Sequence, residues 1–114
     1  MAFGAYTGVN NDSSANVTVN CSNGGTYTVA LGAGSNSNGT TRRMAGPSGQ
    51  FLTYAIYSNA GRTTTWGNGT TFGAQVSGTG TGSNQTLTAY GRVPSGQSPT
   101  PGSYTDTVVV TITY

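Results

Sequence analysis

The C-terminal run of the chain constrains its fold more than any other stretch. Between Gly102 and Tyr114 it consists largely of β-branched and aromatic residues, and apolar and hydroxylated side chains alternate along it. Because successive side chains of a strand point to opposite faces, this run predicts a strand with one buried apolar face and one mostly hydroxylated face. The residues expected on the inward face are Tyr104, Val108, Val110, Ile112 and Tyr114.

The printed sequence ends with this strand, and we expect the outer edge of the strand to be open. A long apolar edge exposes unpaired N–H and C=O groups and is a template for pairing with another chain. The pattern therefore predicts a partner strand from a chaperone, a neighbouring copy or a swapped segment. Alternate apolar residues of that partner would pack near Val108, Val110 and Ile112.

Alternating stretches recur along the rest of the chain and predict an all-β domain. The 19 glycines, seven tyrosines and 5% charged residues suit short strands joined by turns better than helices. With 114 residues, 33% of them hydrophobic, we expect one domain over residues 1–114 with a thin core. Strands separated by regular turn signals are typical of an Ig-like antiparallel β-sandwich. Besides the C-terminal run, the expected strands are residues 15–21, 26–31, 51–57, 72–76 and 85–93, with a short strand or arm at 62–66.

Three expectations concern how these segments are arranged. Residues 15–21 and 26–31 flank the turn signal Ser22–Gly25, which predicts that they pair as a hairpin. Residues 51–57 carry apolar side chains on both faces, which predicts a central strand covered on both sides. Residues 78–83 contain only glycine, threonine and serine and are expected to form a loop.

The residue types that are missing exclude several classes of function. The sequence has no histidine, lysine or glutamate, so neither a zinc ligand set nor a catalytic triad can be assembled. Nothing in the pattern brings Asp12 and Asp106 together as a carboxylate pair. We therefore expect no enzymatic activity, no catalytic residue, no metal and no cofactor. A net charge of +2 is too small for a nucleic-acid footprint, and no apolar run approaches the roughly 18 residues of a membrane-spanning helix.

Cys21 and Trp66 each leave two interpretations open. Cys21 lies in the apolar phase of Ala15, Val17 and Val19 and is the only cysteine, so we expect a free, buried thiol within this chain. Trp66 is either a core residue or an aromatic contact for a sugar ligand in a carbohydrate-binding module. Arg42, Arg43 and Arg62 either bind an anion or lay their stems on apolar surface with the guanidinium in solvent or on a carbonyl.

Several segments, in their order along the chain, resemble the spore coat protein U domain family, found in secreted pilus subunits of the archaic chaperone-usher pathway. The segments that carry the resemblance are Phe3-Gly4-Ala5-Tyr6, Val17-Thr18-Val19-Asn20-Cys21, Tyr27-Thr28-Val29-Ala30-Leu31, Gly34, Arg42-Arg43-Met44, Leu52-Thr53-Tyr54-Ala55-Ile56-Tyr57, Arg62-Thr63-Thr64-Thr65-Trp66-Gly67, Tyr90-Gly91-Arg92-Val93, Gln97 and Gly102 to Tyr114. The resemblance implies an incomplete Ig-like sandwich that lacks its final strand. A periplasmic chaperone would hold this sandwich, and the N-terminal strand of the next subunit would complete it.

The resemblance also implies what lies before this sequence and where the protein acts. Family members carry an N-terminal extension with a donor strand and a cysteine similar to a partner for Cys21, so residues 1–114 resemble a domain truncated at its N-terminus. The implied function is that of a structural subunit or tip adhesin of a bacterial surface pilus, exported through the periplasm. Its implied partners are the chaperone, the usher and neighbouring subunits, with a homopolymer as the product. The alternatives are a structural protein of a spore or cell coat and a carbohydrate-binding β-sandwich module.

Overall fold

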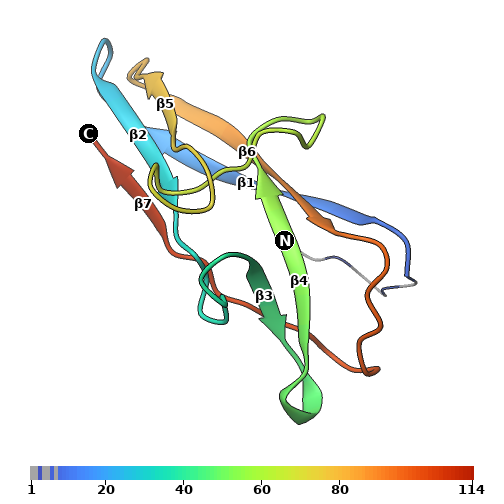
Figure 1. Cartoon of the computed structure of the whole chain (residues 1–114). Helices are drawn as coiled ribbons and strands as arrows, with labels where there is room; N and C mark the ends of the chain where they lie inside the picture. Colours follow the sequence, from blue (N-terminus) through green and yellow to red (C-terminus); the bar gives the residue numbers. More distant parts are fainter. Residues whose placement is uncertain (1–2, 4–5, 7) are drawn as a thin grey trace.

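The computed structural model describes residues 3, 6 and 8–114 (Figure 1). Residues 4 and 5, in one of the segments that carry the family resemblance, lie outside this described part. The strands are β1 (Asn11–Asn20), β2 (Thr26–Leu31), β3 (Arg42–Ala45), β4 (Phe51–Tyr57), β5 (Val76–Thr79), β6 (Asn84–Val93) and β7 (Val110–Thr113), with one 3-10 turn, η1 (Pro47–Gly49). No helix of the described residues is long and apolar enough to cross a membrane.

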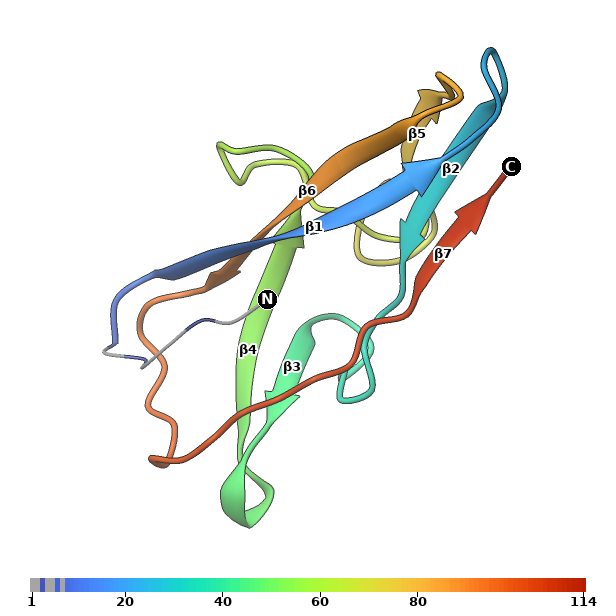
Figure 2. The ribbon, with the colours of Figure 1, turned by 180° about the vertical axis from the view of Figure 1, so that it is seen from behind.

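The strands form two antiparallel sheets, which confirms the predicted all-β sandwich (Figures 1 and 2). One sheet has four strands in the order β1-β6-β4-β3, and the other has three in the order β5-β2-β7. The core between them is made by the inward phase of each alternating strand. Its buried apolar members are Val19, Cys21, Tyr27, Val29, Leu31, Met44, Leu52, Tyr54, Ile56, Trp66, Ala89 and Val93.

The regular strands follow the sequence pattern closely. β2 and β4 have the predicted bounds, and β6 differs from its prediction by one residue. β4 lies between β6 and β3, so its central position is confirmed. Its second face is less covered than expected, because Thr53, Ala55 and Tyr57 are half-buried and Phe51 is exposed.

The predicted hairpin between the first two strands is wrong. β1 pairs along all ten residues with β6, whereas β2 pairs with β5 and β7 in the other sheet. The Ser22–Gly25 turn does exist, with the Gly25 N–H donating to the Ser22 carbonyl at 2.9 Å, but it carries the chain between sheets. This turn is held against the β5–β6 connection, where the N–H of Gly24 donates to the Gly80 carbonyl. The turn residues predict only that the chain reverses its direction. They do not determine which strand β1 pairs with, and β1 pairs with β6 along a ladder of ten residues.

Two further segments differ from expectation. The short β3 was not predicted as a strand, and it pairs with β4 at the sheet edge. The weak strand expected at residues 72–76 is displaced to β5, so Gly78 and Thr79 belong to a strand and only the remainder of the predicted loop is irregular. Gly78 is directly opposite Tyr27, and a Cβ at residue 78 would collide with the tyrosine ring. Glycine at this strand position leaves room for that ring.

The C-terminal segment is extended as predicted, but it is shared between the two sheets. Thr105 pairs with Ala45 at the β3 edge through two hydrogen bonds of 2.8 and 2.9 Å. The carbonyls of Thr107 and Val109 then accept from Ser35 and Gly32, after which β7 pairs with β2. The segment therefore runs from one layer to the other (Figure 2), which is why the continuous strand expected from Gly102 to Tyr114 is reduced to Val110–Thr113.

Candidate functional site

A groove with a volume of about 400 Å³ lies between the C-terminal segment and the inner face of the four-stranded sheet. Apolar side chains dominate its surface, and they come from seven different segments of the chain. The residues that line it are Phe3, Ala15, Asn16, Val17, Leu31, Met44, Tyr54, Ile56, Ala89, Tyr104, Thr105, Asp106, Val108 and Val110.

The floor of the groove is formed by the inward phase of β1 and its neighbours. Ala15 is directly opposite Ala89 in the β1–β6 ladder, and Val17 is opposite Leu87. Ala15 and Val17 are only half-buried, although their alternation with polar residues assigns them to the inner face. The three-stranded sheet does not extend over this part of β1, so an apolar strip of the inner face stays accessible.

The C-terminal segment forms the outer wall of the groove. Some of the residues that were predicted to lie on its inward face do line the groove. Tyr104, Val108 and Val110 line the groove, while Ile112 packs against the core beyond it. Val110 is 43% exposed within the groove. Tyr114 is 70% exposed and does not line the groove, so its expected place on a buried face is wrong.

The opposite phase of the C-terminal segment faces solvent, as the alternation predicts. Val109, which neighbours Val110 in sequence, is 67% exposed and does not line the groove. Thr107, Thr111 and Thr113 are exposed as well, whereas Thr105 is exposed and also lines the groove.

The edge of β7 beside the groove is open in the described part of the chain. β7 has β2 as its neighbour on one side and no sheet neighbour on the other. The Gly32 N–H donates to the Val109 carbonyl at 2.9 Å, so in this antiparallel register Thr111 and Thr113 point their N–H groups toward β2. The N–H groups of Val110 and Ile112 consequently point to the open side.

Asp106 holds the groove wall in place, and the sequence analysis did not identify this role. Its carboxylate accepts the Ser35 N–H at 2.9 Å, the Asn36 side-chain amide at 3.0 Å and the Tyr54 hydroxyl at 2.5 Å. Gly34 has a φ of 87° and allows the close approach, because a Cβ there would overlap the carboxylate. The C-terminal segment is thus joined to the β2–β3 connection and to the centre of β4. A signal was available in the sequence, since Asp106 is the only acidic residue in the C-terminal half.

Burial shifts the pKa of two side chains beside this wall. Burial raises the pKa of Tyr54, and its hydrogen bond to Asp106 raises it further. Burial lowers the pKa of Arg42, which is 3% exposed. The Arg42 guanidinium donates to the carbonyls of Leu31, Gly32 and Trp66 at 2.9 to 3.3 Å. This placement confirms the interpretation in which the guanidinium binds carbonyls rather than an anion.

Near the N-terminus, Phe3 lines the groove and Tyr6 is hydrogen-bonded to the connection after β6. The rings of Phe3 and Tyr54 have centroids 6.3 Å apart. The Tyr6 hydroxyl donates to the Pro94 carbonyl at 2.6 Å and accepts the Gln97 N–H at 3.1 Å. The Gln97 side chain bonds both the N–H and the carbonyl of Thr53, each at 2.8 Å, and so continues the ladder of β4 where β6 has ended.

Trp66 and Cys21 are both core residues. Trp66 is 1% exposed and donates its indole N–H to the Val29 carbonyl at 2.9 Å, which matches the core interpretation. A ring buried to this extent has no free face for a sugar, so Trp66 is not a ligand contact in this structure. Cys21 is a free thiol and 7% exposed, which confirms the predicted burial. A disulfide to a cysteine outside residues 1–114 stays a prediction of the family resemblance.

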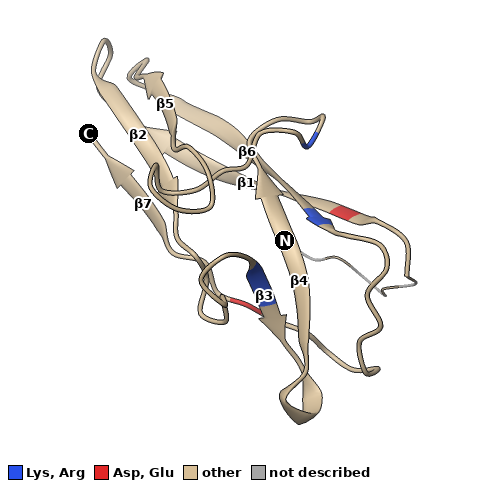
Figure 3. Cartoon of the chain, in the orientation of Figure 1, with Lys and Arg blue, Asp and Glu red and all other residues tan. Residues whose placement is uncertain are grey.

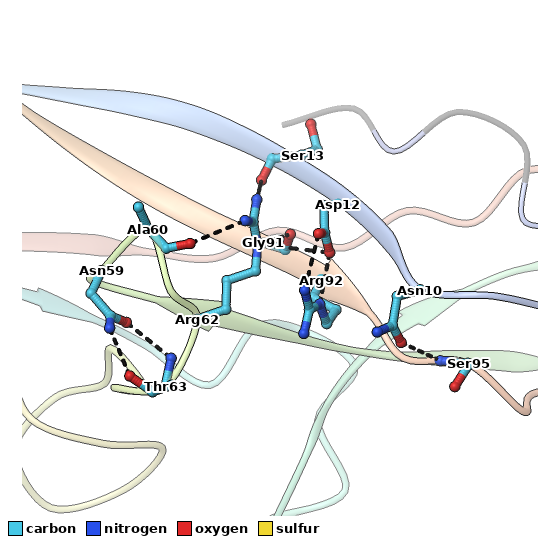
Figure 4. A network of polar contacts seen from close by, with 10 residues as sticks. All are labelled: Asn10, Asp12, Ser13, Asn59, Ala60, Arg62, Thr63, Gly91, Arg92 and Ser95. Carbon is cyan, nitrogen blue, oxygen red and sulfur yellow. Dashed lines mark hydrogen bonds and ion pairs between the residues drawn. The ribbon is translucent and has the colours of Figure 1, made fainter.

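The charged residues are few and are divided between separate places (Figure 3). Asp12 accepts two hydrogen bonds from Arg92, at 2.8 and 3.1 Å, and lies 3.7 Å from Arg62 (Figure 4). The hydrogen bond from Arg92 is the main reason that the pKa of Asp12 is lowered. Arg62 also donates to the carbonyls of Ser13 and Gly91, so this network joins β1, β6 and the connection after β4.

Chemistry that needs several ionisable groups has no assembled site in the described residues. Asp12 and Asp106 share none of their partners, and Figure 3 shows them on different segments. No group of three potential metal-ligating side chains occurs among residues 3, 6 and 8–114. The groove has an apolar floor and an open strand edge beside it. This geometry suits recognition of an extended peptide.

Comparison with known proteins places this geometry in a family. Residues 1–111 match the Spore Coat Protein U domain. The chain is 35% identical over 129 residues to Protein U of Myxococcus xanthus, covering 100% of this chain and 71% of that protein.

The fold also matches a solved structure, described as the CsuC–CsuE chaperone-tip adhesion subunit pre-assembly complex from archaic chaperone-usher Csu pili of Acinetobacter baumannii. The TM-score is 0.71 at 22% identity, and the match covers 90% of this chain and 34% of that one. This likeness confirms the predicted fold, and the chain spans about a third of that protein's length. The match over residues 1–111, together with the 35% identity to Protein U, shows that the chain belongs to the Spore Coat Protein U domain family.

Proposed function

We propose that this protein is a structural subunit of a bacterial surface pilus and that its groove receives an apolar strand from a neighbouring subunit. The observation that carries the proposal is the coincidence of an open β7 edge with a groove lined by Ala15, Val17 and Val110. A strand laid there satisfies the backbone groups of the β7 edge with hydrogen bonds and its alternate side chains fill the groove.

The expected gain from such a strand is large compared with the stability of a domain. Complete burial of one aliphatic side chain is favourable by roughly 1.5 to 3 kcal/mol. Two or three donor side chains in the groove would therefore contribute several kcal/mol, against roughly 5 to 15 kcal/mol for the net stability of a folded domain. The free domain should be markedly less stable than the filled one.

The solved relative supports an order of assembly. That structure is described as a pre-assembly complex of a chaperone and a tip adhesion subunit. We propose by analogy that a periplasmic chaperone fills the groove first and that a neighbouring subunit replaces it at an usher. The protein would then act outside the cell as part of a homopolymer, as a shaft subunit or as a tip adhesin, with no enzymatic activity.

A thermal melting experiment with a donor peptide tests the groove. The probe is a synthetic peptide of alternating valine and threonine, and the control peptide has the same composition in scrambled order. The alternating peptide should raise the melting temperature of the parent and should not raise that of Val110→Asp, because a carboxylate would then face the apolar donor side chains. Val109→Asp is the matched control, since residue 109 points away from the groove, and it should keep the full gain.

The proposal is wrong if the alternating peptide leaves the melting temperature of the parent unchanged. It is also wrong if Val109→Asp and Val110→Asp lose the gain equally, because the effect would then not depend on the groove.

A coat protein is the second candidate, favoured by the name of the matching family, the Spore Coat Protein U domain. The two candidates share the groove and differ in how it is filled during export. Co-expression with the small Ig-like chaperone of the same genome should give a complex that releases the chaperone when the alternating peptide is added, if the protein is a pilus subunit. A coat protein that assembles unaided would be secreted equally well without the chaperone.

A further inference from the structure

Two loops of the protein are built on the same four-residue sequence. Asn38-Gly39-Thr40-Thr41 precedes β3, and Asn68-Gly69-Thr70-Thr71 precedes β5. In each loop the asparagine Oδ1 accepts the N–H and the hydroxyl of both threonines, at 2.8 to 3.1 Å in the first and 2.7 to 3.2 Å in the second. The glycines have nearly equal φ angles of 94° and 89°. The loops are therefore matched in both sequence and geometry.

The loops differ in what holds the glycine N–H. Gly69 donates to the main-chain carbonyl of Gly73 at 3.0 Å, and this bond lies beside a second one from Gly67 to Ala74. Gly39 donates instead to the hydroxyl of Ser37 at 2.9 Å, which is a side-chain contact at the exposed surface.

The third Asn-Gly pair of the chain, Asn23-Gly24, resembles the second loop in this respect. The Gly24 N–H donates to the Gly80 carbonyl at 3.0 Å. Gly80 in turn donates to the Gly25 carbonyl, so the partner is itself held in place.

The backbone nitrogen of the glycine that follows an asparagine is the nucleophile of asparagine deamidation. After losing its proton to a base, the glycine nitrogen attacks Cγ of the preceding asparagine, the new C–N bond closes a succinimide, and the side-chain nitrogen leaves as ammonia. Water then opens the ring at either carbonyl and gives aspartate or isoaspartate. An N–H that is hydrogen-bonded to a fixed carbonyl must first be released by local opening, whereas a surface hydroxyl can rotate away within the folded protein.

We propose that Asn38 is the preferred deamidation site of the folded protein, and that Asn23 and Asn68 are protected by the carbonyl partners of their glycines. The product at Asn38 is an aspartate or isoaspartate on the surface loop before β3. Each event removes one unit from the net charge of +2.

The test is peptide mapping by mass spectrometry after incubation of the native protein in mildly alkaline buffer at 37 °C, with the same incubation in urea as the reference. Asn38 should convert several-fold faster than Asn68 in the native protein, and the two rates should be similar in urea, where sequence alone acts. Ser37→Ala should accelerate Asn38 in the native protein without changing Asn68. Ser37→Thr, which keeps the hydroxyl, should leave both rates at the parent values.

The appearance of an acidic species in ion-exchange chromatography gives a second readout of the same event. Native rates that are equal at Asn38 and Asn68, or an Asn38 rate that is indifferent to Ser37→Ala, would overturn the proposal.

Discussion

Removal of the Asp106 carboxylate is the perturbation whose cost follows most directly from the structure. Asp106→Ala deletes the acceptor of three hydrogen bonds, from the Ser35 N–H, the Asn36 amide and the Tyr54 hydroxyl. The Ser35 N–H also donates to the Thr107 carbonyl at 3.0 Å and keeps this acceptor, so its loss is small. The Tyr54 hydroxyl is left without this acceptor in a residue that is buried.

The magnitude can be worked out from these three bonds. A hydrogen bond to a charged group contributes roughly 1.5 to 3 kcal/mol, and a buried polar group left without a partner costs about 1 to 3 kcal/mol. Counting the buried hydroxyl fully and the two more exposed donors in part gives a loss of about 3 kcal/mol. For a domain of this size that corresponds to a fall of about 12 °C in melting temperature, at about 4 °C per kcal/mol.

The assay is urea and thermal unfolding followed by circular dichroism, with Asp12→Ala as the matched control. Asp12 forms an exposed ion pair with Arg92, and such pairs contribute less than about 1 kcal/mol. A double-mutant cycle with Tyr54→Phe should show a coupling of about 1 kcal/mol or more between residues 54 and 106. The reasoning is refuted if Asp106→Ala is no more destabilising than Asp12→Ala, or if the two residues show no coupling.

Three further outcomes follow from buried side chains. Arg42→Met should lower the free energy of unfolding by about 3 kcal/mol, because the carbonyls that receive its guanidinium lose their donor, while Arg43→Met should cost much less; equal losses would contradict this. Cys21 should react with a thiol reagent only at the rate of unfolding, and fast labelling of the native protein would show that it is exposed. The raised pKa of Tyr54 keeps its hydroxyl protonated in the folded protein, whereas Tyr54 of the unfolded chain loses its proton near pH 10. The free energy of unfolding should therefore fall as the pH rises from about 9 to 11. Tyr54→Phe should show a weaker fall over the same range, and an equal fall would exclude Tyr54 as a source.

The fold could be predicted where local pattern and local turns decide it. β2 and β4 were located to the residue because period-two alternation is bounded on both sides by turn residues. The predicted hairpin between residues 15–21 and 26–31 is wrong because β1 pairs with β6, which is more than sixty residues away from it in sequence. β3 was missed because Arg42 breaks the apolar pattern, and its burial is compensated by carbonyls that only the folded chain brings near.

Of the groove, only the wall formed by the C-terminal segment could be predicted from the sequence. This wall was visible in the sequence, since Val108, Val110 and Ile112 lie in one phase of a β-branched run whose other phase is mostly threonine. The floor of the groove could not be predicted. Ala15 and Ala89 lie in the inward phase of alternating strands, and this pattern does not tell whether another strand covers them. The role of Asp106 depends on the change of sheet within the C-terminal segment, which no local pattern indicates.

Amide hydrogen exchange along β7, measured by NMR on the isotope-labelled protein with and without the alternating valine–threonine peptide, tests the groove most directly. The N–H groups of Thr111 and Thr113 point to β2, so they should be protected in both samples and serve as internal controls. The N–H groups of Val110 and Ile112 point to the open side and should exchange fast in the free protein. Added peptide should slow their exchange strongly, because a strand then binds that edge. Protection of Val110 and Ile112 without peptide, or unchanged fast exchange at saturating peptide, would contradict strand binding at this groove.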